Sequence, residues 1–187
     1  MMKNKKHFFL IFLFTAVLIF GARIWASPFF QEEFEVAIYQ YPYMKLIANP
    51  ASNRIDTRYT FINAENDFEL RYSFFSQTKE ETEHINRAFA LFVIPIINDA
   101  VGYEVELTNI ELYDNQDVAE EYNGDIGLSV FIPNPPSDYG SGYAFMLLSF
   151  FFKIGNGIVM QTILFDDIEF AGTEEFWEVS HTFRFFD

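Results

Sequence analysis

The chain has 187 residues, a formal net charge of −15 and no cysteine, so its core must hold the fold without disulfides. Residues 1–26 contain four of the twelve basic residues and none of the twenty-seven acidic ones, which leaves residues 27–187 with eight basic residues and a formal charge of −19. A surface this acidic repels phosphate backbones and anionic headgroups, because both are bound by clustered Lys and Arg. We therefore expect no nucleic-acid ligand.

The first 26 residues have the three parts of a secretory signal. Three lysines precede a thirteen-residue run from Phe8 to Phe20 in which only Thr15 is polar, and the small residue Ala26 ends the segment. The run is shorter than the roughly 20 residues that a membrane span needs. We expect a periplasmic or extracellular protein, cleaved near Ala26, with no stable transmembrane segment after processing. An uncleaved N-terminal anchor is the alternative. Since exported eukaryotic domains often carry disulfides, their absence favours a bacterial protein.

Residues 27–187 are predicted to form a single α+β domain, beginning with a strand over residues 34–40. Polar and apolar residues alternate over 57–63 and 68–77, and the four-residue connection between these runs predicts a hairpin. The alternation places Phe68, Leu70, Tyr72 and Phe74 on one face of the second strand and its polar residues on the other.

A helix over residues 78–98 is the next predicted element. Thr78 and Glu81 fit a capping box, in which each side chain bonds a free amide of the first turn. Six apolar residues then recur at helical spacing from Ile85 to Ile96. Pro95 is expected to kink the last turn or to end the helix.

The second half of the chain is dominated by strands. A long hairpin is predicted because Gly155, Asn156 and Gly157 tolerate the positive φ of a tight turn. Its first strand is apolar on both faces, so we expect layers above and below the sheet. The predicted elements are a strand over 103–113, a short helix over 115–122, a strand over 126–132, a loop over 133–142, the hairpin strands 143–154 and 158–165, and a final helix over 174–183. They indicate a mainly antiparallel sheet covered by helices.

This order of elements resembles the PsbP-like fold, a sheet between helical layers found in photosystem accessory proteins and small bacterial envelope proteins. The resemblance covers most of residues 34–185. It rests on the hairpin before the Thr78–Asn98 helix, the Phe145–Phe165 hairpin with its Gly-Asn-Gly turn, and the closing helix around Trp177. It implies a binding or assembly role rather than an enzymatic one, and no functional residue is carried over.

The residues indicate no catalytic or metal site and no cofactor. His84 and His181, the two histidines of residues 27–187, have no second ligand nearby in sequence, and each is expected on a helix surface. No Gly-x-Ser-x-Gly elbow occurs. Asp166 and Asp167 follow a predicted strand, where carboxylates could bind calcium or serve a hydrolase. Both of these functions are kept as alternatives.

Tyr39, Tyr41 and Tyr43 are not explained by strand alternation and form a candidate contact patch, with core packing as the alternative explanation. Asp166 and Asp167 are the other candidate contact residues. We therefore predict an exported, non-enzymatic binding or assembly module of the bacterial envelope. Its expected partner is another exported or envelope protein, and it is expected to be a monomer.

Overall fold

The computed structural model describes residues 29–31, 34–49, 55–63, 65, 67–76 and 79–186, with side chains at all of these except 29–31, 79–88 and 90. The predicted signal segment and the proposed cap residue Thr78 lie outside the described residues. No helix within the described part of the chain is long and apolar enough to cross a membrane.

The elements follow one another as strands with a few helices between them, where η denotes a 3₁₀ or π turn. They are β1 (Phe29–Gln31), β2 (Val36–Ile38), β3 (Met44–Ile47), β4 (Tyr59–Asn63), β5 (Phe68–Phe75), α2 (Lys79–Val101), η2 (Leu107–Asn109), β6 (Ile110–Leu112), α3 (Asn115–Asp117), η3 (Val118–Tyr122), β7 (Ile126–Pro133), α4 (Ser137–Gly140), β8 (Phe145–Lys153), β9 (Gly157–Phe165), η4 (Ile168–Gly172), α5 (Glu174–Ser180) and β10 (Phe183–Phe185).

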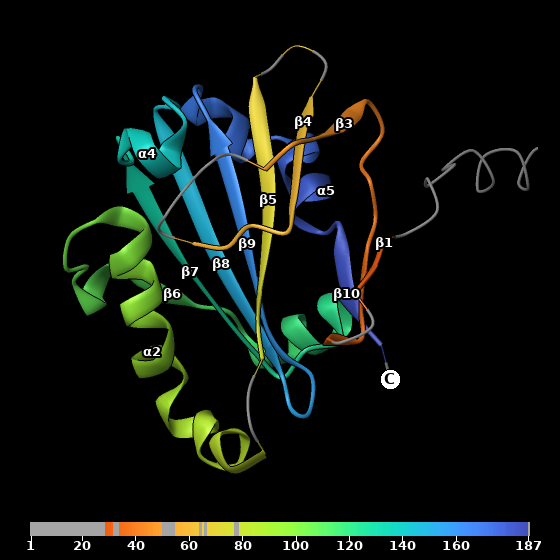
Figure 1. Cartoon of the computed structure of the whole chain (residues 1–187), viewed down its shortest axis with the longest axis vertical. Coiled ribbons are helices and arrows are strands. Elements are labelled where there is room, and N and C mark those ends of the chain that lie inside the picture. Colours follow the sequence, from red (N-terminus) through yellow and green to blue (C-terminus); the bar gives the residue numbers. More distant parts are fainter. Residues whose placement is uncertain are drawn as a thin grey trace, which may run out of the picture.

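Two antiparallel sheets organise these elements (Figure 1). The large sheet has seven strands in the order β3-β4-β5-β9-β8-β7-β6, and the small sheet has three in the order β1-β2-β10. The predicted hairpins are β4–β5 and β8–β9, and the second turns through Gly155 and Gly157 at φ values of 90° and 115°. The α+β fold with a mainly antiparallel sheet is therefore confirmed.

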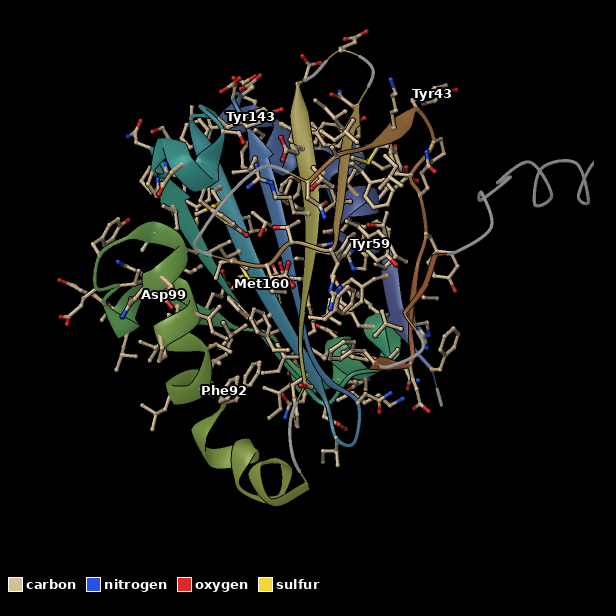
Figure 2. All side chains as sticks on the ribbon, viewed as in Figure 1. Tyr43, Tyr59, Phe92, Asp99, Tyr143 and Met160 are labelled. Atoms are coloured by element: carbon tan, nitrogen blue, oxygen red, sulfur yellow. The ribbon has the colours of Figure 1, made fainter. Side chains whose placement is uncertain are left out.

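Helix α2 covers one face of the large sheet, which we call the α2 face (Figure 1). Val93, Ile97 and Ala100 are fully buried there against apolar residues of β7, β8 and β9. Figure 2 shows Phe92 of α2 and Met160 of β9 on this side of the molecule. Contrary to one of the two expectations for Pro95, the helix does not end there, because it continues to Val101.

The opposite face carries the small sheet, η3 and α5, and we call it the small-sheet face. Val36 and Phe185 of the small sheet, Val118 of η3 and Val179 of α5 pack with Phe151 of β8 in one buried cluster. The sheet is thus covered on both faces, as predicted from the apolar strand β8. The second layer is largely β structure rather than helix.

Three predicted elements differ from the structure. The loop expected over 133–142 contains the short helix α4. Of the strand expected over 103–113, only β6 pairs with another strand, because residues 103–106 have no neighbouring strand among the described residues and Leu107–Asn109 forms the 3₁₀ turn η2. The final helix expected over 174–183 ends at Ser180, because Phe183–Phe185 forms β10 and pairs with β2 at the start of the domain.

The polar side of β5 is buried against the α2 face. Arg71 is fully buried, and its guanidinium donates to Glu69 Oε1 at 2.5 Å, to the Tyr139 carbonyl at 2.5 Å and to Ser141 Oγ at 2.6 Å. Its Cζ also lies 5.1 Å from the Tyr139 ring centroid. This cluster ties β5 to the segment around α4.

Candidate functional site

A polar row crosses the middle of the small-sheet face. Cross-strand pairing aligns Tyr72 of β5 with Gln161 of β9, Ser149 of β8 and Ser129 of β7, and all four are buried. Gln161 Nε2 donates to Tyr72 Oη and to the Ser180 carbonyl, both at 3.1 Å. A buried amide and hydroxyls on an otherwise apolar face are costly unless they are bonded. The row therefore fixes where α5 meets the sheet.

Above this row, five rings stack in succession from α5 to the end of β6. Trp177 lies 4.1 Å from His181, His181 lies 5.0 Å from Tyr122, Tyr122 lies 4.1 Å from Phe151, and Phe151 lies 5.5 Å from Tyr113, each measured between ring centroids. We call these five residues the aromatic arc. The successive interplanar angles are between 10° and 32°, which is close to stacked geometry.

The local structure of α5 positions one end of the arc. Thr173 Oγ1 accepts a hydrogen bond from the Phe176 amide at 3.1 Å, which caps the helix start. Trp177 and His181 are then four residues apart and share one side of the helix. Because α5 ends at Ser180, His181 sits at its C-terminus rather than on the helix surface that the sequence suggested.

Glycine at position 127 allows Tyr113 to lie against the sheet at the other end of the arc. A Cβ on Gly127 would lie 2.8 Å from Tyr113 Cδ2 and 2.9 Å from Val118 Cγ2, so a side chain there would push both residues away. Tyr113 Oη also lies 3.3 Å from Ser149 Oγ of the polar row.

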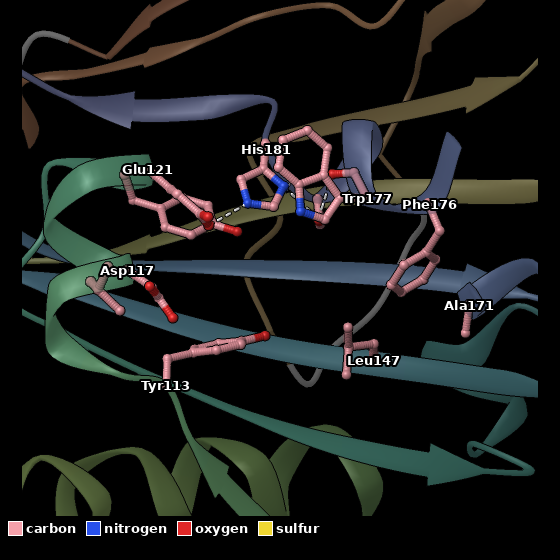
Figure 3. A pocket seen from close by; sticks show the side chains of 11 residues that line it. Tyr113, Asp117, Glu121, Leu147, Ala171, Phe176, Trp177 and His181 are labelled. Atoms are coloured by element: carbon pink, nitrogen blue, oxygen red, sulfur yellow. Dashed lines mark hydrogen bonds and ion pairs between the residues drawn. The ribbon is translucent and has the colours of Figure 1, made fainter. Parts of the chain in front are cut away.

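A cavity of about 310 Å³ opens between η3, α5 and this part of the sheet, and we call it the cleft. Figure 3 shows Tyr113 on one side of the cleft and Trp177 with His181 on the other, with Asp117 of α3 and Glu121 of η3 at one end. Among the residues that the structure describes, no lysine or arginine lines it. The cleft therefore has aromatic walls and a carboxylate end.

The two carboxylates of the cleft differ in their contacts. Glu121 Oε2 lies 2.5 Å from His181 Nε2. Asp117 is exposed, and its carboxylate has no hydrogen bond or ion pair with any of the described residues. The neighbouring Tyr122 is mostly buried, which raises the pKa of its hydroxyl well above the ordinary value, with a smaller contribution from Tyr113. Tyr122 thus stays neutral at physiological pH.

Ser180, His181 and Glu121 have the residue types of a hydrolytic triad, but the hydrogen bonds do not suit one. His181 Nδ1 lies 2.6 Å from the Trp177 carbonyl oxygen and 3.0 Å from Ser180 Oγ. A carbonyl only accepts, so Nδ1 carries the hydrogen and cannot take a proton from Ser180. The Ser180 hydroxyl itself donates to the Trp177 carbonyl at 2.7 Å. These contacts hold the end of α5.

The three tyrosines predicted as a contact patch lie between β2 and β3. Tyr43 is 88% exposed at φ 70°, and Figure 2 shows it at the outer edge of the molecule. Tyr39 and Tyr41 are half-buried. Tyr41 Oη donates to Glu178 of α5 at 2.9 Å, and the Tyr39 amide donates to the Thr182 carbonyl. The segment therefore joins the small sheet to α5 and exposes one tyrosine strongly.

Asp166 and Asp167 lie at the end of β9, and neither lines the cleft. Asp166 Oδ1 accepts from the Ala144 amide at 2.9 Å, and Asp167 Oδ1 accepts from the Glu169 amide at 2.9 Å. Within the described residues, no three His, Asp or Glu side chains gather closely enough to hold a metal. The His84 side chain lies outside the described part.

The sequence reasoning did not identify the cleft residues as a site. Tyr113, Asp117 and Glu121 are more than 50 positions from Trp177 and His181. The signals present were local: Asp117 and Glu121 are four residues apart, as are Trp177 and His181, and each pair shares one side of a helical turn. Only the pairing of the strands brings the two pairs together.

The fold is similar to that of cyanobacterial PsbP (CyanoP) from Synechocystis sp. PCC 6803, known from its solution structure. The two chains have a TM-score of 0.52 and 14% sequence identity, over 86% of this chain and 92% of that chain. At this identity the likeness shows the fold alone, as a distant structural match to the PsbP-like fold. No protein-family model matches the chain, and no curated protein does either.

Proposed function

We propose that this protein is an exported, non-enzymatic binding or assembly module that holds a partner protein of the bacterial envelope at the cleft. The observation that carries the proposal is the open aromatic wall of the cleft, where Trp177 is 55% exposed. Trp and Tyr are enriched where proteins bind each other, because their rigid rings supply a large contact area. An exposed tryptophan stacked on a fixed ring needs little ordering on binding.

Two further observations support a binding role. His181 Nδ1 cannot act as a base for Ser180, because it already donates to the Trp177 carbonyl. We therefore assign these hydrogen bonds to stabilising the end of α5 rather than to activating a nucleophile. The fold is similar to cyanobacterial PsbP, and the PsbP-like resemblance implies binding or assembly by analogy. Export rests on the signal-like residues 1–26, and the acidity of residues 27–187 suits a basic partner surface.

The test is a capture experiment with envelope extract, using immobilised protein and variants of matched exposure. Trp177→Ala removes the exposed ring of the cleft, whereas Leu91→Ala removes a similarly exposed side chain on α2, on the opposite side of the sheet. A partner retained by the wild type and Leu91→Ala but lost by Trp177→Ala supports the proposal. A partner lost only with Tyr43→Ala would place the contact at the tyrosine segment instead, and no partner at all would contradict a binding role.

A further inference from the structure

We propose that the cleft accepts the ammonium or guanidinium group of a Lys or Arg side chain on the partner protein. This inference rests on the proposed function and names the chemical group that enters the cleft. It follows from the shape of the cleft, from its rings and from its charge.

The rings of the cleft suit a cation. A cation is attracted to the face of an aromatic ring within about 6 Å of the ring centroid, most strongly for tryptophan. One face of Trp177 stacks on His181, and no other ring among the described residues contacts Trp177. Because Trp177 is more than half exposed, part of its indole remains accessible to a cation. Tyr113 supplies a second ring across the cleft (Figure 3).

The charges of the cleft also favour a cation. Asp117 has no partner within the described part of the chain, and Glu121 is bonded to His181. An incoming cation therefore meets the carboxylate of Asp117, to which no described residue is bonded, and the lining residues that the structure describes include no Lys or Arg. His181 already lies flat between Trp177 and Tyr122 with its Nε2 against a carboxylate. A planar guanidinium stacks on aromatic rings in the same manner.

The size of the cleft indicates a side chain rather than a large molecule. Its volume of about 310 Å³ is at the lower end of the roughly 300–1,000 Å³ of pockets that enclose drug-sized ligands. The cleft is open to solvent at Trp177, so the rest of a partner could lie across its rim. The excess of acidic residues over the whole chain would also steer a basic partner towards it.

The test uses the fluorescence of Trp177 as a reporter. The chain has two tryptophans, so the full-length Trp25→Phe variant has Trp177 as its single one. It is titrated with the peptides acetyl-Gly-Lys-Gly-amide and acetyl-Gly-Arg-Gly-amide, and with the same peptide carrying uncharged norleucine. We expect the basic peptides to bind about tenfold more tightly than the norleucine peptide, since a cation over an indole contributes about that factor. Added salt should weaken their binding.

Two cleft variants and one control assign the binding to the cleft. Asp117→Asn keeps the shape and removes the charge, and we expect about threefold weaker binding of the basic peptides, as for an exposed ion pair. Tyr113→Ala removes the opposite ring and should weaken binding by a similar factor. Glu104→Gln removes an exposed carboxylate outside the cleft and should change nothing. Equal urea midpoints for these three variants and for the Trp25→Phe parent would show that folding is retained.

A fourth probe, n-butylamine, separates a partner side chain from a free amine. Tighter binding of the lysine peptide than of butylamine supports a side chain whose backbone contacts the rim, and equal or tighter binding of butylamine overturns the assignment to a partner. Equal affinity for the lysine and norleucine peptides, or unchanged affinity in Asp117→Asn and Tyr113→Ala together, would also overturn the inference. Partner capture is measured separately, so a captured partner without any response to basic peptides leaves the proposed function standing while this inference falls.

Discussion

The two faces of the large sheet are covered in different ways. On the α2 face, one long helix places Val93, Ile97 and Ala100 on aliphatic and aromatic side chains. On the small-sheet face, three short pieces meet over the polar row, and the cleft remains between η3 and α5. A single long helix can cover a flat face continuously, whereas short elements leave gaps at their ends. We therefore expect the free energy of unfolding to depend mainly on the α2 face, and partner binding to depend on the cleft.

The largest effect is expected where the α2 face contains a buried charge. Arg71→Met would leave Glu69 buried without its partner, and we expect a loss of about 3–5 kcal/mol in the free energy of unfolding. Arg58→Met is the matched control, because the Arg58–Asp56 pair is exposed and should contribute less than about 1 kcal/mol. Urea denaturation measures both.

Replacing both charges tests whether the unpaired Glu69 carboxylate causes the loss of stability. The double variant Arg71→Met, Glu69→Leu removes the stranded carboxylate, so it should be more stable than Arg71→Met alone. If the double variant were the less stable of the two, the unpaired Glu69 carboxylate would not be costly at this buried position, contrary to this account.

A cavity on the α2 face should be the next most destabilising change. Ile97 of α2 is fully buried against the large sheet, and Ile97→Ala is expected to cost about 2–5 kcal/mol by lost burial and an unfilled cavity. The measurement is again the urea midpoint, with Leu91→Ala of the same helix as an exposed control. If Ile97→Ala and Leu91→Ala lowered the free energy of unfolding by similar amounts, α2 would not pack against the sheet through Ile97 as described.

High pH should destabilise both faces through their buried tyrosines. Burial raises the pKa of Tyr72 on the small-sheet face and of Tyr139 on the α2 face, and it raises that of half-buried Tyr143 to about 12. Above pH ~10 an unfolded tyrosine loses its proton while the folded one keeps it, so the free energy of unfolding falls as pH rises. This stabilisation is complete below pH ~10 and is lost above it.

The slope of the free energy of unfolding against pH gives the size of the loss at high pH. Each fully buried tyrosine should contribute up to about 1.4 kcal/mol per pH unit above pH ~10. Tyr72→Phe removes one such group, together with its bonds to Thr182 and Gln161, so the slope should decrease by about that amount. Urea midpoints between pH 9 and 11.5 measure it, and an unchanged slope in Tyr72→Phe would show that Tyr72 ionises normally.

The sequence predicted the elements that local patterns define. Alternation and the Gly155–Gly157 turn predicted both hairpins, and apolar residues at helical spacing predicted α2. β2 lies within the strand predicted over residues 34–40, but its partner β10 was missed. β10 has only three residues and pairs with a strand at the other end of the domain, so it carries too little local pattern to be predicted.

Two further differences have the same cause. The alternation of β5 placed Arg71 opposite the apolar residues but gave no sign that Tyr139 and Ser141 cover it. The cleft depends on Gly127, which admits Tyr113, and on η3 meeting α5 over the polar row. Such contacts join segments far apart in sequence, so local periodicity does not predict them.

The most direct test of the account measures stability and partner capture on the same preparation of Trp177→Ala. Trp177 is more than half exposed, so we expect the free energy of unfolding to change by less than about 1 kcal/mol. Capture of the envelope partner should nevertheless be lost, because the open ring of the cleft is gone. If Trp177→Ala kept both its stability and its partner, the cleft would not be the binding site, and the central claim would be contradicted.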